Sequence, residues 1–178
     1  MLDCVDLFPL VLHLIGDIDV NKKAIISKII AQLTLDIELY TKAAKTSRYE
    51  ATHESSKAEN KYDTRGLEAS YLARGQSRQV AGVMSALEQF QRLVARDFSS
   101  NDPIDLGALV ELKVGRQTSV VFVGASAGGT EILHGKTEIF VITPQSPLGQ
   151  KLMGQRQGSK FYLELGNDRV EHSVIRVE

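Results

Sequence analysis

Two stretches of apolar residues with alternating three- and four-residue steps constrain the fold of this 178-residue chain more than any other feature. Steps of this kind keep one seam of a helix facing a partner helix. Because only a short polar turn separates the two stretches, the partner is predicted to be the same chain folded back as an antiparallel coiled-coil hairpin. The first seam is Ile26, Ile30, Leu33, Ile37, Tyr40, Ala44, Ser47 and Ala51, and the second is Tyr62, Gly66, Ala69, Ala73, Gln76, Val80, Val83, Leu87, Phe90 and Val94.

The predicted hairpin is an arm with a firm base and a slender end. Its first helix should run over 21–52 with Asn21 as N-cap, a length of about 45 Å. Ser56 and Glu59 have the spacing of a capping box, so the second helix should begin there and continue to about Ala95. The seam side chains shrink toward a tip near 53–60, where small residues replace large ones.

The pattern changes at Asn101-Asp102-Pro103, after which apolar residues recur with the period of two that is typical of strands. Ser146 as N-cap, Pro147 at the first helical position and Gly154 past the end predict one short helix. The sequence therefore predicts an α+β protein: an extension over 1–20, the hairpin over 21–98, and a curved antiparallel β-sheet domain with one short helix over 99–178. Strands are expected near 107–114, 118–124, 137–143, 160–165 and 170–177.

Composition excludes several classes of partner and chemistry. The 21 Lys and Arg are balanced by 22 Asp and Glu, for a net charge of −1, which argues against sequence-specific binding to nucleic acid. Cys4 is the only cysteine, so an internal disulfide and a cysteine-based zinc site are both excluded. A reducing cytoplasm is the predicted location.

The first 19 residues contain an apolar run over 7–15 that resembles part of a secretion signal. Asp3 and Asp6 occupy what should be a basic region, no small-residue cleavage site follows, and the run is too short to span a membrane. Two interpretations remain: an amphipathic segment that packs on the helices, or upstream sequence from a mis-assigned start, with Val20 near the true N-terminus. Neither involves a membrane.

Two further patterns are explained without a catalytic role. The sequence Gly135-Lys136-Thr137 resembles the end of a phosphate-binding loop, but Thr130 stands where that motif needs a glycine, so a hairpin loop is predicted. The four histidines suggest no nucleophile–base arrangement and are expected at the surface. A cation site made by His53, Glu54, Glu59 and Asp63 is less favoured than a solvated charged turn.

Three segments resemble the bacterial GreA/GreB family of transcript-cleavage factors, which includes Rnk-like regulators. Residues 56–60, Ser-Lys-Ala-Glu-Asn, occupy the place of the family's Asp-Leu-x-Glu-Asn tip, and 107–112 resemble its opening strand. Residues 142–154, from Ile142 to Gly154, match its most recognisable segment, a helix opened by Ser-Pro and closed by Gly. The resemblance covers 21–178 and implies an FKBP-like fold for the β domain.

The resemblance implies that the protein acts on RNA polymerase at the secondary channel. The β domain would dock on the channel rim, with Ser146, Pro147, Leu148, Gly149 and Gly154 as partner-binding residues, while the arm passes inward. The tip carboxylate of Glu59, beside Asn60, would help to hold a second catalytic magnesium ion so that a backtracked polymerase cleaves its own transcript. The chain would then be a monomeric factor acting on another enzyme's active site, with no cofactor and no stable metal site of its own.

One departure from the family bears on this function. Ser56 stands where the family has Asp, which keeps a helix cap and loses a charge, and Glu54 and Asp63 are the candidates to replace the missing acid. Glu59 itself has a competing role as the reciprocal partner in the capping box.

The alternative within the same fold is a channel-blocking or competing regulator that does not stimulate cleavage. Alternatives of another class are a peptidyl-prolyl isomerase, which the scarcity of aromatic residues disfavours, and a coiled-coil scaffold that self-associates through Ile25 and Ile29.

Overall fold

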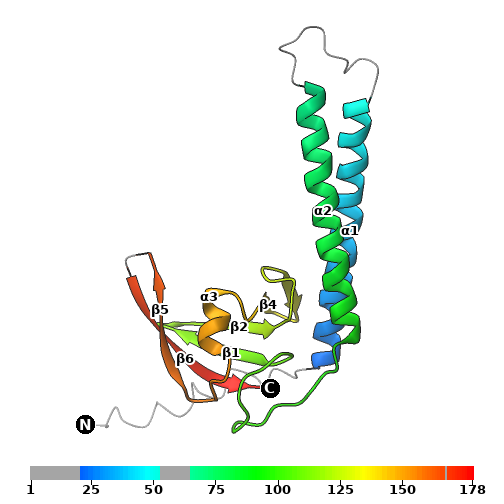
Figure 1. Ribbon diagram of the computed structural model, residues 1–178. Coiled ribbons are helices and arrows are strands. Elements are labelled where there is room, and N and C mark those ends of the chain that lie inside the picture. Colours follow the sequence, from blue (N-terminus) through cyan, green and yellow to red (C-terminus); the bar gives the residue numbers. More distant parts are fainter. Residues whose placement is uncertain (1–20, 53–64, 167) are drawn as a thin grey trace, which may run out of the picture.

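A helical hairpin followed by a curved six-stranded sheet makes up the α+β architecture of the protein, seen in a computed structural model (Figure 1). The structure describes residues 21–52, 65–166 and 168–178. The arm consists of α1 (Lys22–Thr52) and α2 (Arg65–Arg92). The β domain contains β1 (Leu109–Val114), β2 (Gln117–Val123), β3 (Glu131–His134), β4 (Thr137–Ile142), α3 (Pro147–Leu152), β5 (Lys160–Leu165) and β6 (Asp168–Val177).

The first helix follows the sequence prediction closely. The Asn21 side chain caps it by accepting a hydrogen bond from the Ala24 amide at 3.1 Å. Its 31 residues give a length of about 46 Å. The second helix ends at Arg92, earlier than expected, and Val94 beyond it is 80% exposed, so placing Val94 on the seam was wrong. The predicted capping box at 56–59 and the segment 1–20 lie outside the described residues.

The predicted seam is confirmed over the described part of the arm. Apart from Val94, and Ala51 and Tyr62, whose side chains are not described, each seam residue is buried or half-buried. Ile25 and Ile29, however, are both 0% exposed because they pack against the β domain. The proposed self-association of the arm through these two residues is therefore wrong.

The sheet has the strand order β3-β4-β2-β1-β6-β5, and it is mixed rather than purely antiparallel. Pairing of β2 with β4 is parallel, with Val120 opposite Ile139, whereas the other pairs are antiparallel. The parallel pair arises because β3 intervenes: the chain leaves β2, returns along β3 and turns back into β4. The sequence missed β3, a strand of four residues in which only Ile132 is fully buried.

Each face of the sheet is covered by a separate core. Because side chains alternate along a strand, Val120 and Phe122 of β2 face the base of the arm, while Val121 and Val123 face α3. The arm-side core contains Ile25, Ile26, Ile29, Leu33, Ala86, Phe90, Leu109, Val120, Phe122, Ile132, Ile139 and Val141. The α3-side core contains Phe98, Ile104, Ala108, Val110, Leu112, Val121, Val123, Leu152, Phe161, Val174 and Val177.

The short helix forms as the sequence predicts. Ser146 Oγ accepts a hydrogen bond from the Gly149 amide at 3.0 Å, Pro147 is the first helical residue, and Gly154 follows with φ +77°. Within the residues that the structure describes, no helix is both long enough and apolar enough to cross a membrane.

Candidate functional site

The residues predicted to act at the tip lie outside the described residues. They are Glu54, Ser56, Glu59, Asn60 and Asp63, together with His53 of the disfavoured cation site. The described helices end at Thr52 and Arg65, at the far end of the arm from the β domain, and residues 53–64 connect these ends (Figure 1). The site that the structure does describe is the arm that carries this segment.

A groove of about 470 Å³ lies between the two helices in the distal half of the arm. Small seam residues create it, because Ala44 and Ala73 leave space that larger side chains fill nearer the base. It is lined by Thr41, Ala44, Lys45, Arg48, Thr52, Ser70, Ala73, Arg74, Ser77 and Val80.

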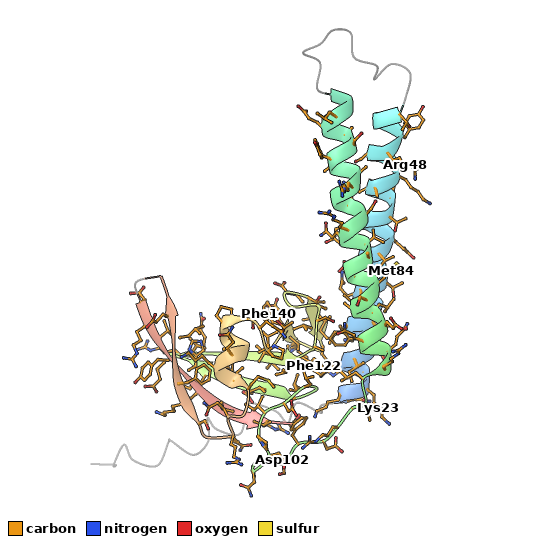
Figure 2. The ribbon with its side chains drawn as sticks, in the orientation of Figure 1. Lys23, Arg48, Met84, Asp102, Phe122 and Phe140 are labelled. Carbon is orange, nitrogen blue, oxygen red and sulfur yellow. The ribbon has the colours of Figure 1, made fainter. Side chains whose placement is uncertain are left out.

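The groove is electropositive. Lys45, Arg48 and Arg74 are exposed at its walls, and no Asp or Glu is among the lining residues that the structure describes. Ser70 and Ser77 donate their hydroxyl protons to backbone oxygens one turn earlier, at 2.9 and 2.8 Å, so their oxygen lone pairs remain able to accept. Three cations around a narrow groove favour contact with an anionic surface or a phosphate backbone. Figure 2 shows Arg48 in this distal part of the arm.

Sequence reasoning missed this groove, although the signal was present. The net charge of −1 hides a local excess: the described distal segments 41–52 and 65–78 contain Lys42, Lys45, Arg48, Arg65, Arg74 and Arg78 against Glu50 and Glu68. A count of charge along the arm, rather than over the chain, would have found it.

The base of the arm is joined to the β domain by packing as well as by the chain. Phe90 of α2 lies against Phe122 of β2 with ring centroids 6.1 Å apart. Lys28 Nζ donates to the Leu133 carbonyl oxygen of β3 at 2.6 Å. Figure 2 shows Phe122 on the β-domain side of this contact. The arm is thereby held at a fixed angle to the sheet.

Lys22 provides a polar anchor at the same junction. It is 6% exposed, donates to the carbonyl oxygen of Arg96, and lies 4.7 Å above the ring of Phe98, while the Arg96 guanidinium lies 4.6 Å from that ring. Burial lowers the pKa of Lys22, an effect that the nearby Asp97 and Glu178 oppose. The segment after α2 is thus tied to the first turn of α1.

A second groove, of about 500 Å³, lies between the arm and the loop at 126–130. Asp36 and Tyr40 of α1 and Gln79 of α2 form its arm side. The hydroxyl oxygen of Ser126 is buried there without a hydrogen-bond partner, and Ala127 has φ +60°. Its mixed lining indicates no single ligand.

Most residues predicted to bind a partner around α3 have a structural role. Ser146 is the helix cap, and Leu148 packs against the α3-side core. Gly149 is buried so closely that an added Cβ would lie 1.9 Å from the Thr143 carbonyl oxygen. Pro147 and Gly154 are exposed and available to a partner. Their partner-binding role stays a prediction.

The structure also shows where Gly135, Lys136 and His172 lie. Gly135 and Lys136 form the turn between β3 and β4, which confirms the predicted hairpin loop. His172 is not at the surface as expected: it is 5% exposed and stacks on Phe161 at 5.3 Å. In the described ranges, no three His, Cys, Asp or Glu side chains gather as a metal site would require.

Comparison with known proteins gives likenesses to solved structures alone, since no family model and no curated protein sequence matches the chain. One is GreA factor homolog 1 (Gfh1) of Thermus thermophilus: 21% identity over 84% of this chain and 94% of that one, TM-score 0.35. Another is Gfh1 of Thermus aquaticus, with 23% identity, 85% and 92% coverage, and TM-score 0.37. A GreA/GreB elongation factor from Nitrosomonas europaea shows 16% identity, 54% and 78% coverage, and TM-score 0.33.

Proposed function

We propose that the protein binds bacterial RNA polymerase at its secondary channel and modulates transcript elongation by inserting the arm. The observation that carries the proposal is the arm itself: a hairpin about 46 Å long, rooted in a hydrophobic core and electropositive toward its end. A narrow rod of this kind, anchored at its base, is suited to entering a channel in another protein. The resemblance of residues 56–60 and 142–154 to the GreA/GreB family names the partner.

In this proposal the β domain docks on the channel rim and fixes the direction of the arm. The fixed angle matters, because movement at the base of the arm would displace the tip over a wide range of positions. The tip would then seldom lie at the polymerase active site. The arm-side core and the Lys22 anchor are what oppose such a hinge. Exposed Pro147 and Gly154, on a helix held by its cap, are the rim-facing positions that we propose.

At the tip, we propose that Glu59 supplies a carboxylate oxygen to a magnesium ion in the polymerase active site, with Asn60 beside it. The second ion of a two-metal hydrolysis is held by hard oxygen ligands, and an acid brought from outside adds one. Glu54 or Asp63 would serve as the second acid in place of Ser56. The protein is on this proposal no enzyme itself and needs no cofactor of its own.

The specific alternative is a regulator that blocks the channel without stimulating cleavage. Ser56 favours it, since a hydroxyl in place of the family's acid leaves Glu59 as the sole acid of the five-residue tip motif. An isomerase activity is less favoured, because Phe98 and Phe161 are buried in the α3-side core and are not available to line a substrate pocket.

A transcript-cleavage assay on stalled bacterial polymerase tests the proposal. We expect the wild-type protein to bind and to increase cleavage, Glu59→Gln to bind equally and lose most of the stimulation, and Ser56→Asp to raise it. Glutamine still serves a capping box but is a poor magnesium ligand, so this pair separates capping from chemistry. Cleavage that appears only with Ser56→Asp would favour the blocking alternative, and absence of binding by the wild type would refute both.

The docking surface needs a variant that keeps the base of the arm. Removal of residues 21–98 would strip Phe122, Ile139 and the rest of the arm-side core of their cover, so that truncation cannot report on binding alone. A shortened arm that joins residue 37 to residue 80 through a glycine-serine turn retains the base. We expect it to bind polymerase and to have no effect on cleavage.

A further inference from the structure

Among the residues that the structure describes, none pairs with the outer edge of β5, which is a free sheet edge. Of the two edge strands, β3 is covered by the arm, since Lys28 of α1 bonds to the Leu133 carbonyl. By contrast β5 pairs with β6 alone, and no described backbone group pairs with its other edge. A free edge presents a row of amide and carbonyl groups that can accept another strand.

The backbone groups that point outward from β5 can be identified. The Val174 amide donates to the Ser159 carbonyl at 2.9 Å, and residue 160 lies opposite residue 173. Hydrogen bonding to the neighbour alternates along an antiparallel strand, so Phe161 and Leu163 bond to β6. Lys160, Tyr162 and Glu164 therefore direct their amides and carbonyls at the free edge.

We propose that this edge pairs antiparallel with β5 of a second copy of the chain, in a register centred on Tyr162. In that register Tyr162 lies opposite Tyr162 of the second copy, and Lys160 lies opposite Glu164 of the second copy, twice by symmetry. All three outward-facing residues then form hydrogen-bonded pairs, and the two sheets become continuous.

Side-chain charge favours this register. It also favours a second copy of the chain as the partner that pairs with the β5 edge. Arg169 lies opposite Glu164 within the chain, so the row across the joined sheets reads Arg169, Glu164 and then Lys160 of the second copy, with alternating sign. The two Glu171 carboxylates are separated by both Tyr162 strands, about 14 Å at the usual strand spacing. That distance exceeds the screening length at physiological salt, so their repulsion is small.

The opposite face of β5 is apolar, and in the same register it lies beside the corresponding apolar face of the second copy. Phe161 lies opposite Leu163 of the second copy, which extends the α3-side core across the junction. Phe161 is buried in that core, and Leu163 is half-buried. Pairing would cover the exposed part of Leu163, as a continuing sheet does at any interior strand.

The side chains at the edge leave the backbone accessible. Lys160 Nζ and the Tyr162 hydroxyl both donate to the Glu171 carboxylate, at 3.1 and 2.9 Å, and the Arg169 guanidinium lies 4.3 Å from the Tyr162 ring centroid. These contacts lie across β5 and β6 on one face of the sheet and involve none of the outward backbone groups of β5. Two strands of six residues make a small interface, so the dimer should be weak and dependent on concentration.

Charge complementation between two variants tests the proposal by sedimentation equilibrium, with melting curves to confirm folding. Glu164→Lys places lysine opposite Lys160 in a homodimer, and Lys160→Glu places glutamate opposite Glu164. We expect the wild type to dimerise at high concentration, each variant alone to associate at least tenfold more weakly, and their equimolar mixture to recover association within about threefold of wild type. The control Glu138→Lys, on β4, should behave as wild type.

Three outcomes would overturn the proposal. The wild type could remain monomeric at the highest soluble concentration, the single variants could associate as wild type does, or the mixture could fail to recover. The second outcome would place an interface elsewhere on the chain, and the third would show that the charge changes act through folding rather than pairing.

Discussion

The base and the distal half of the arm differ in how their helices are packed. At the base, Ile26, Ile29 and Leu33 of α1 meet Ala86 and Phe90 of α2 and the sheet, and all are at most 7% exposed. In the distal half the seam holds alanines, serine, glycine and Gln76, and a groove of about 470 Å³ opens between the helices.

The difference teaches how one hairpin can be both an anchor and a probe. Buried apolar area gives the base its stability, whereas the distal half keeps its two helices together with little burial and leaves its charges exposed. The narrow distal half of the arm can enter a confined space, and the packed base fixes the direction of the arm. We therefore expect stability variants to act at the base and functional variants to act distally.

The largest effect is expected from Phe90→Ala at the base. Phe90 is 2% exposed and packs on Phe122, so its removal leaves a cavity shared by the arm and the sheet. We expect a loss of about 3–5 kcal/mol in the free energy of unfolding. Chemical denaturation monitored separately by helix and sheet signals should show both domains losing stability together.

The matched distal variant is Leu72→Ala. Leu72 is 54% exposed on the arm, and its truncation should cost less than about 0.5 kcal/mol. Equal losses for Phe90→Ala and Leu72→Ala would show that the two halves of the arm are packed alike, contrary to the comparison.

The next effect separates function from stability. Reversing the groove cations with Lys45→Glu, Arg48→Glu and Arg74→Glu together should weaken polymerase binding by at least tenfold, or about 1.4 kcal/mol. All three side chains are exposed, so the melting temperature should change by only a few degrees. Fluorescence anisotropy at several salt concentrations would measure the loss, which should shrink at high salt.

The control for this reversal is Arg78→Glu, an exposed arginine on the same helix that does not line the groove. We expect its affinity to equal that of wild type within the error of the measurement, because Arg78 does not line the groove. If Arg78→Glu lost one third as much binding free energy as the triple variant, each cation of the arm would contribute equally. Binding would then depend on the total charge of the arm rather than on the groove.

How much of this could be predicted from the sequence differs between the two regions. Seam positions, the Asn21 cap and the α3 segment were readable because each depends on local spacing. The arm-side core was not, because Ile25 and Ile29 lie off the hairpin seam, and only the folded chain brings Phe122 and Ile139 against them. Strand β3 was not predicted from the sequence for a similar reason. Its position depends on its pairing with β4 and on its contact with Lys28 of the arm.

A smaller effect of opposite sign is expected from the mid-helix glycines. Gly75 and Gly82 of α2 have no atom within 4 Å of an added Cβ, so alanine fits without contact. Gly75→Ala and Gly82→Ala should each stabilise the arm by about 0.5–1 kcal/mol, since glycine weakens a helix interior. Thermal melting of helix signal would measure the gain.

The matched glycine at the base is Gly124, where an added Cβ would lie 2.8 Å from Phe90 Cζ. We expect Gly124→Ala to destabilise by about 1–3 kcal/mol, because the added Cβ would also lie 2.9 Å from the Ser126 backbone oxygen, which cannot move aside as the end of a side chain can. A gain in stability at Gly124, or a loss at Gly75, would remove the distinction between a packed base and an open distal arm.

The smallest effect concerns the charge buried at the base. The pKa of Lys22 is lowered by burial, so between that lowered value and the usual value near 10.5 the unfolded chain binds more protons than the folded one. Stability contributed by this group therefore rises as pH increases through that window. Lys22→Met, which keeps the aliphatic packing on Phe98 and removes the titration, isolates the effect. We expect the difference in unfolding free energy, wild type minus variant, to increase as the pH rises toward 10.5 in urea titrations. A difference that is constant with pH would show that Lys22 titrates as it does in solvent and that the base is wetter than its burial indicates.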